Sequence, residues 1–151
     1  AGNAMSNEAI VFQGTQKTLE SSGGSIASLA VVQATVADYS IIADGANYPD
    51  AEFVLTATFS VAPVENTKLA LYARSLDVDG ATDTEVPEAG RPEKYIGDFS
   101  VNFVTSAQTM VLRAQDVPTA ASYYIHNVNA GQSVAAGWVL KVTPRTIGPA
   151  A

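Results

Sequence analysis

The chain has 151 residues and a mass of 15.7 kDa, the size of one domain with a core of its own. Apolar residues make up 47% and charged residues 15%, so an intrinsically disordered chain is excluded, and no apolar run is long enough for a membrane span. The formal net charge is −7 and the basic residues are scattered singly, which argues against nucleic-acid binding. Because there is no cysteine, disulfides, thiolate zinc sites and cysteine nucleophiles are excluded too. A single histidine excludes any site built from two imidazoles.

The two ends of the chain lack a regular pattern. Residues 1–5, up to the first methionine, are interpreted as a remnant of cloning. The stretch over residues 6–20 has one short apolar group, Ile10-Val11-Phe12, which predicts a leading arm or an edge strand. We expect a single sandwich domain over residues 6–146, arm included, followed by a loose tail over residues 147–151.

A run rich in alanine and β-branched residues covers residues 26–42. Its alanines favour a helix over residues 26–37. The pairs Val31-Val32 and Ile41-Ile42 favour strands instead, because branching at Cβ suits an extended backbone. We expect two strands here with a break near Ala37-Asp38, and a helix is the alternative.

Alternation of apolar and polar residues is the clearest signal in the chain. It covers residues 53–61, 69–74 and 95–103, and a period of two places one face of a strand in the core and the other toward water. The first two of these segments, joined by a turn at residues 63–67, predict an antiparallel hairpin. Further strands are expected at residues 109–113, 123–127 and 138–143, and Pro144 is expected to end the last one.

These segments predict an all-β fold. About eight strands separated by Gly, Pro, Asn and Asp turns, without a convincing helix, indicate an antiparallel β-sandwich that is jelly-roll-like. The acidic loop over residues 77–93 is longer than a hairpin turn, so connections that cross between sheets are expected rather than a simple meander.

Two features invite a catalytic or metal-binding interpretation. A general base at His126 would need a nucleophile and an orienting acid, which the sequence does not show, and a solvent-facing strand histidine is favoured. Residues 77–85 resemble a calcium loop, but glycine stands at the fourth position rather than the sixth and no glutamate stands at the twelfth. We therefore expect a solvated acidic loop, and we predict no catalytic, cofactor-binding or metal site and no cofactor.

Aromatic residues offer a second kind of site, because they can form a platform for sugar rings. The candidates are Trp138, Tyr123, Tyr124, Tyr72 and Tyr95. Trp138 alternates with Leu140 and Val142, so a core position is favoured for it. The glycines Gly23-Gly24 and Gly131 have no phosphate-loop context.

Three segments resemble small structural proteins of tailed bacteriophages. They are residues 48–53 (YPDAEF), 71–80 (LYARSLDVDG) and 131–144, with AGWVLKVTP at its end. The resemblance covers residues 24–146. It implies a virion protein that decorates or cements a capsid, with a jelly-roll fold and assembly as a homo-oligomer, and it carries over no catalytic residue.

The sequence therefore predicts a non-enzymatic virion structural protein, a capsid decoration or cement subunit that bridges neighbouring shell subunits. Its expected partners are capsid or other virion proteins and further copies of itself, without nucleic acid or membrane. It would be made in the bacterial host cytoplasm and reside in the virion. The alternative is a carbohydrate- or receptor-binding β-sandwich module, which predicts an exposed aromatic platform, and a hydrolase that uses His126 is the third hypothesis.

Overall fold

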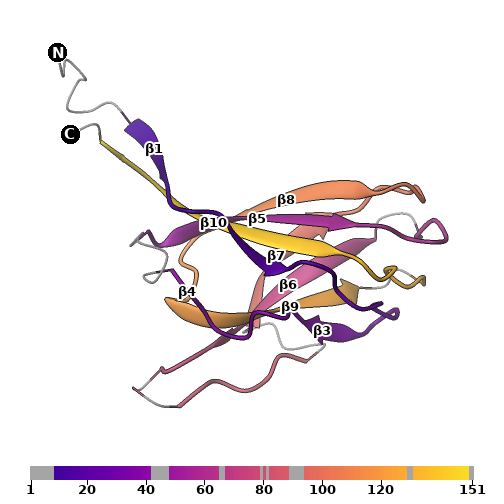
Figure 1. Cartoon of the computed structure of the whole chain (residues 1–151), viewed down its shortest axis with the longest axis horizontal. Helices are drawn as coiled ribbons and strands as arrows, with labels where there is room; N and C mark the ends of the chain where they lie inside the picture. Colours follow the sequence, from indigo (N-terminus) through magenta and orange to yellow (C-terminus); the bar gives the residue numbers. More distant parts are fainter. Residues whose placement is uncertain are drawn as a thin grey trace.

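The structure is a computed structural model, and it describes residues 9–41, 48–64, 67–78, 80, 82–88, 94–128 and 131–149. Ten strands form two antiparallel sheets, which face each other as a sandwich (Figure 1). Within these residues there is no α-helix, and none of them forms a helix long and apolar enough to cross a membrane. The predicted antiparallel sandwich is confirmed. Residues 1–5, interpreted above as a remnant of cloning, lie outside the described residues.

The first sheet has the strand order β1-β10-β5-β8. β2 pairs with β10 on the same side as β1, at residues 140–142 of β10. Its strands are β1 (Ala9–Gln13), β2 (Lys17–Glu20), β5 (Asp50–Ala57), β8 (Gln108–Ala114) and β10 (Val139–Pro149). Every second residue of β5 is buried, as the alternation predicted. This period places Phe53 and Leu55 in the core and Glu52 on the outer face.

The second sheet has the order β3-β9-β6-β7, and β4 pairs with β9. Its strands are β3 (Val31–Gln33), β4 (Tyr39–Ser40), β6 (Lys68–Ser75), β7 (Tyr95–Ser100) and β9 (Ala120–Val128). In β6 and β9 successive residues are buried rather than alternate ones. Both faces of this sheet are therefore covered along its middle.

The core between the sheets holds the bulky aromatic side chains. The largest fully buried ones are Trp138, Tyr39, Tyr123, Phe53, Phe59 and Phe99. Phe53 of the first sheet packs on Tyr123 of the second with ring centroids 5.0 Å apart. Burial of a side chain of this size stabilises the fold by about 1.5–3 kcal/mol. The core position predicted for Trp138 is confirmed, and Tyr123 is a core residue as well.

The predicted hairpin of residues 53–61 and 69–74 is wrong. The strands at these positions, β5 and β6, belong to different sheets, and the connection through residues 58–67 crosses between them. Each of the two strands has one apolar face. Such a face can be buried equally well when the two strands lie in opposite sheets of a sandwich and when they are neighbours in one sheet. Alternation identifies the strands but not the sheet that each one joins.

Residues 26–41 contain two short strands, β3 and β4, separated by residues 34–38. The helix alternative for this run does not occur. Ala34 donates its amide to Tyr123 O and Val36 donates its amide to Leu19 O, so the chain reaches the edge of the first sheet here before β4 returns to β9 of the second sheet.

The last strand is longer than predicted, because Pro144 does not end it. Pro144 lies opposite Ala51 of β5, and its carbonyl accepts the amide of Gly14 at 2.8 Å. A proline keeps its acceptor while it loses its donor, so the strand continues through it. Residues 145–149 pair with β1, which is the edge strand expected of the N-terminal segment, and residues 147–149 are thus part of a strand rather than a loose tail.

Trp138 closes one end of the core by contacting a pair of glycines. Its Nε1 donates to Gly24 O at 2.7 Å, and the amide of Gly23 donates to Trp138 O at 2.9 Å. The indole lies directly against Gly23, where a Cβ would come within 2.0 Å of Trp138 Cε2. A Cβ added to Gly24 would meet no atom within 4 Å.

We expect Gly23→Ala to lower the free energy of unfolding by about 2–3 kcal/mol, because the buried indole has no free space into which it can move. The matched control is Gly24→Ala, which should stay within about 0.5 kcal/mol of the unsubstituted protein. Urea unfolding followed by tryptophan fluorescence measures both. Equal midpoints for the two variants would contradict this packing.

Candidate functional site

Three of the five aromatic candidates lie together on the outer face of the second sheet. Tyr72 of β6 is opposite Tyr124 of β9 on one side and opposite Tyr95 of β7 on the other. The rings of Tyr72 and Tyr95 meet edge to face, with centroids 6.1 Å apart. We call these three residues the tyrosine face. The other two candidates, Trp138 and Tyr123, are buried in the core.

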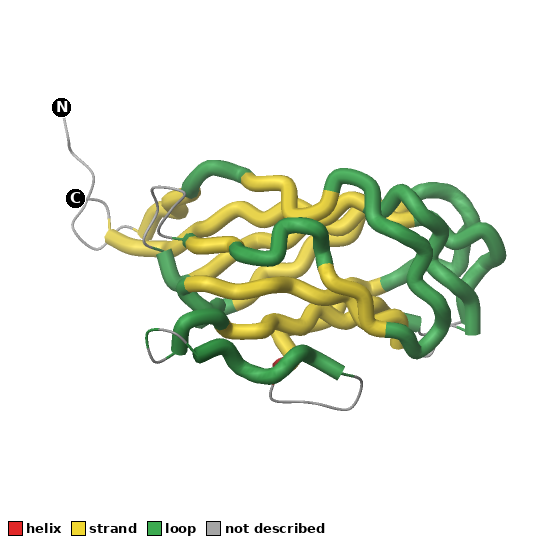
Figure 2. The backbone as a smooth tube through the Cα atoms, turned by 60° about the horizontal axis from the view of Figure 1, so that its bottom comes forward, coloured by secondary structure: helices red, strands yellow, loops and turns green. Residues whose placement is uncertain are grey.

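Most of the tyrosine face is covered. Residues 82–88, which we call the strap, run along the outer side of the second sheet (Figures 1 and 2). Pro87 of the strap is buried, and so are Tyr72 and Tyr124, although both lie on an outer face. Tyr95 is 44% exposed. A ligand approaching this face from solvent therefore meets Tyr95 first.

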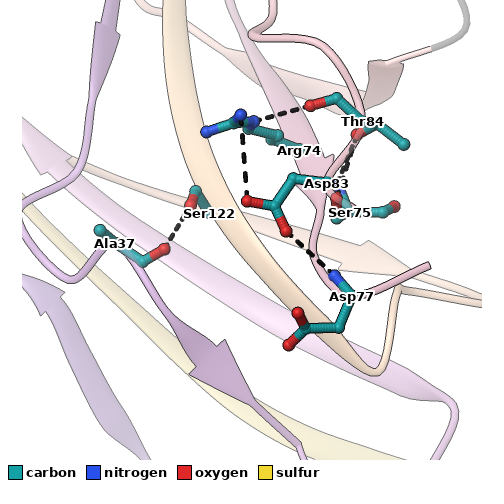
Figure 3. A network of polar contacts seen from close by, with 7 residues as sticks. All are labelled: Ala37, Arg74, Ser75, Asp77, Asp83, Thr84 and Ser122. Carbon is teal, nitrogen blue, oxygen red and sulfur yellow. Dashed lines mark hydrogen bonds and ion pairs between the residues drawn. The ribbon is translucent and has the colours of Figure 1, made fainter. Parts of the chain in front are cut away.

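Arg74 and Ser75, at the end of β6, anchor the strap (Figure 3). Arg74 Nε donates to Thr84 O at 2.7 Å, and its guanidinium lies 3.9 Å from a carboxylate oxygen of Asp83. The amide of Thr84 donates to Ser75 O, and the amide of Ser75 donates to Thr84 Oγ1, each at 2.9 Å. Asp83 also accepts the amide of Asp77 at 3.1 Å.

These contacts account for part of the acidic segment that resembles a calcium loop. Asp83 binds a guanidinium and a backbone amide, and Asp77 has a left-handed backbone with φ of 53°. In the part of the chain that the structure describes, no group of three or more His, Asp or Glu side chains is placed to hold a metal ion. Asp79 and Ala81 lie outside that part.

His126 also lies on the outer face of the second sheet, but it does not face solvent as predicted. It is only 7% exposed, and its ring packs on that of Tyr72 with centroids 5.8 Å apart. Burial lowers the pKa of His126 from its ordinary value of 6.5, and the backbone of Leu29 acts in the opposite direction. The lowered pKa favours the neutral imidazole in the folded protein.

A pocket opens beside the tyrosine face, where β6 begins and β7 ends. It has a volume of about 470 Å³ and is lined by Val64, Thr67, Lys68, Asp98, Ser100, Val101, Asn102 and Phe103. Phe103 is 65% exposed, so its ring is available to a ligand. We call this the Phe103 pocket. The start of β6 and the end of β7, which border it, lie at the end of the sandwich opposite to the projecting strand β1 (Figure 1).

The sequence analysis missed Phe103, because alternation assigned it to the buried side of a strand over residues 95–103. The strand ends at Ser100 instead. Gln108 holds the backbone of the following loop: its Oε1 accepts the amide of Asn102 at 2.7 Å, and its Nε2 donates to Asn102 O at 2.9 Å. This bracing turns the loop away from the sheet and exposes Phe103. Asn102 lies directly before Phe103, and because asparagine is frequent in turns, it was the signal in the sequence that the strand ends earlier.

Polar groups stand beside the Phe103 ring. Lys68 Nζ lies 3.3 Å from Asp98 Oδ2, and both side chains are partly exposed. Tyr95 donates its hydroxyl hydrogen to Asp98; burial and this hydrogen bond raise the pKa of Tyr95 to about 12. An exposed ion pair contributes little to stability, so replacing it by contacts with a ligand would cost little. The pocket combines one exposed aromatic ring with a donor and an acceptor.

Comparisons with known proteins agree on the fold. No family model and no curated protein matches the chain. The CBM36-1 domain of a multidomain xylanase from the hindgut metagenome of Trinervitermes trinervoides has a similar structure, with a TM-score of 0.50 at 9% identity over 89% of this chain and 96% of that domain. A CBM35 from Cellvibrio japonicus Abf62 has a TM-score of 0.40 at 13% identity over 95% and 99%. The label CBM denotes a carbohydrate-binding module.

The predicted function, a capsid decoration subunit, is wrong. The CBM36-1 domain, which has a similar fold, is a carbohydrate-binding module, and nothing in the comparisons indicates a phage protein. The residues behind that prediction explain the error: LYAR is part of β6, and Trp138 with its neighbours belongs to the core and to β10. Such segments reflect the packing of a sandwich, which is a fold that serves many functions.

We expect the free energy of unfolding to fall as the pH drops through and below 6.5, the pKa of an unperturbed histidine. The folded protein binds a proton at His126 more weakly than the unfolded chain does. The contribution of the neutral histidine to stability is therefore fully present above that pH and is lost progressively below it. His126→Gln removes the titration and should flatten the dependence between about pH 7.5 and pH 5. Urea unfolding across this range measures both proteins, and identical slopes would contradict a buried neutral histidine.

Proposed function

We propose that this chain is a non-catalytic module that binds carbohydrate at the Phe103 pocket. The exposed Phe103 ring carries the proposal, because it stands next to Lys68 and Asp98 in a preformed hollow. A pyranose has an apolar C–H face that packs on an aromatic ring, and its hydroxyl groups both donate and accept hydrogen bonds. The pocket offers partners for both.

The proposal needs an exposed aromatic ring beside polar groups, and Phe103 is such a ring although the sequence did not single it out. The sequence named Trp138, Tyr123, Tyr124, Tyr72 and Tyr95; only Tyr95 of these is exposed, and it is joined to the pocket through Asp98. Asp98 thus lines the pocket together with Phe103 and also interacts with Tyr95.

Two further observations support the proposal. The CBM36-1 domain, which belongs to a xylanase, shares the fold at a TM-score of 0.50, and we extend carbohydrate binding from it to this chain. The net charge of −7 would repel acidic polymers, so a neutral polysaccharide is the expected ligand. Xylan is the first probe to use.

Phe103→Ala should weaken binding to a neutral polysaccharide at least tenfold, which corresponds to about 1.4 kcal/mol, because it removes the stacking ring. Affinity electrophoresis in gels containing xylan, mannan or mixed-linkage glucan identifies the ligand, and titration calorimetry then gives the affinity. Val111→Ala is the matched control, since Val111 is 51% exposed on the first sheet, away from the pocket.

The control should bind as the unsubstituted protein does. Two results would refute the proposal. In one, none of the polysaccharides retards the unsubstituted protein. In the other, Phe103→Ala binds as tightly as Val111→Ala.

A further inference from the structure

A two-stranded ribbon projects from the sandwich at the end opposite to the Phe103 pocket (Figure 1). It consists of β1 and residues 145–149 of β10, which run antiparallel from Ala9 opposite Pro149 to Gln13 opposite Arg145. The pairing of β10 with β5 stops at Arg145, which lies opposite Asp50. Beyond that point β1 is the only described strand that pairs with β10.

The ribbon is poorly protected from water. Val11 lies opposite Ile147, and these side chains are 50% and 63% exposed. Phe12 packs on Tyr48, with ring centroids 6.5 Å apart, which holds the ribbon against the body on one side only. Two strands without a third are marginally stable in water, so further pairing would stabilise this element.

The edges next to β1 offer less to a further strand than β1 does. The outer edge of β2 is occupied, because Leu19 O accepts the amide of Val36 and the buried carboxylate of Glu20 accepts the amide and hydroxyl of Thr35. On the free side of β10, Pro149 has no amide to offer. Proline and charge are the usual protections of a sheet edge, and Ala9–Gln13 contains neither.

The backbone of β1 is oriented for pairing on its outer side. Gly14 donates its amide to Pro144 O, across from β10. Hydrogen-bonding groups alternate in direction along an antiparallel strand, so the amides and carbonyls of Val11 and Gln13 face away from β10. No described strand pairs with them, so another strand can add here.

We propose that this chain forms a two-fold dimer in which the β1 strands of two copies pair antiparallel about Val11. A two-fold contact requires a self-complementary strand. Antiparallel pairing about Val11 places Ile10 opposite Phe12 and Val11 opposite its own counterpart, so apolar residues meet apolar residues. Ala9 and Gln13, which lie opposite each other, are uncharged. Two copies with a net charge of −7 each can meet here without like charges in direct opposition.

Such a dimer would join the two first sheets into one continuous sheet. The Phe103 pockets would then lie at its two far ends, and if the proposed function holds, the dimer presents two sites to one polysaccharide, which raises its avidity without a new contact. The pairing itself does not depend on carbohydrate binding.

Sedimentation velocity over a range of protein concentrations, without any carbohydrate, tests the dimer. The unsubstituted protein should shift from monomer to dimer as its concentration rises. Val11→Pro removes an outward amide and none of the hydrogen bonds to β10, so it should weaken association at least tenfold. Val11→Ala retains the backbone edge and serves as the control that still dimerises.

A charge exchange separates loss of pairing from loss of folding. Val11→Lys and Val11→Glu should each be monomeric, because each opposes two like charges at the two-fold axis. An equimolar mixture of the two should dimerise again, which unfolded variants would not do. A protein that stays monomeric at every concentration, or a mixture that does not associate, would overturn the proposal; carbohydrate binding by the monomer would stand in either case.

Discussion

The burial of one apolar face from each sheet against the other is the constraint on which the rest of this structure depends. The sandwich is held by side chains such as Phe53 and Tyr123, which reach the same space from opposite sheets. Every residue used in this way is lost to ligand binding. Trp138, the largest aromatic residue in the chain, is an example, since its ring is enclosed and its one donor is satisfied by Gly24 O. Only the outer faces of the sheets, the loops and the strand edges remain accessible to a ligand or partner.

On the second sheet even the outer face is partly enclosed. The strap lies along it, anchored through Arg74, and a small apolar cluster on this sheet includes Tyr72 and Tyr124. His126 lies between β3 and β6 with its ring on Tyr72, and its burial there lowers the pKa of the imidazole. The accessible surface of this sheet is therefore concentrated toward Tyr95 and the Phe103 pocket, where aromatic rings and an ion pair stand side by side.

The two ends of the molecule differ in character. The pocket end is built from loops that are braced by side-chain contacts, such as that of Gln108 with Asn102. The other end extends as a ribbon of backbone hydrogen bonds with little side-chain cover. Loops suit the recognition of a small, polar ligand, whereas an open strand suits the addition of another strand. Both proposals rest on this difference.

Alternation of residue types determined where the strands lie, because a period of two leaves a pattern in any half-buried strand. The strands around Phe53 and Leu71 and the core position of Trp138 were predictable from it. Tertiary contacts between distant segments decided the rest. They placed β5 and β6 in different sheets, continued β10 through Pro144 by pairing it with β1, buried His126 against Tyr72, and turned Phe103 outward where Gln108 holds Asn102. Local sequence shows that a side chain has an apolar face, but only the folded chain decides whether that face meets the core, another segment or a ligand.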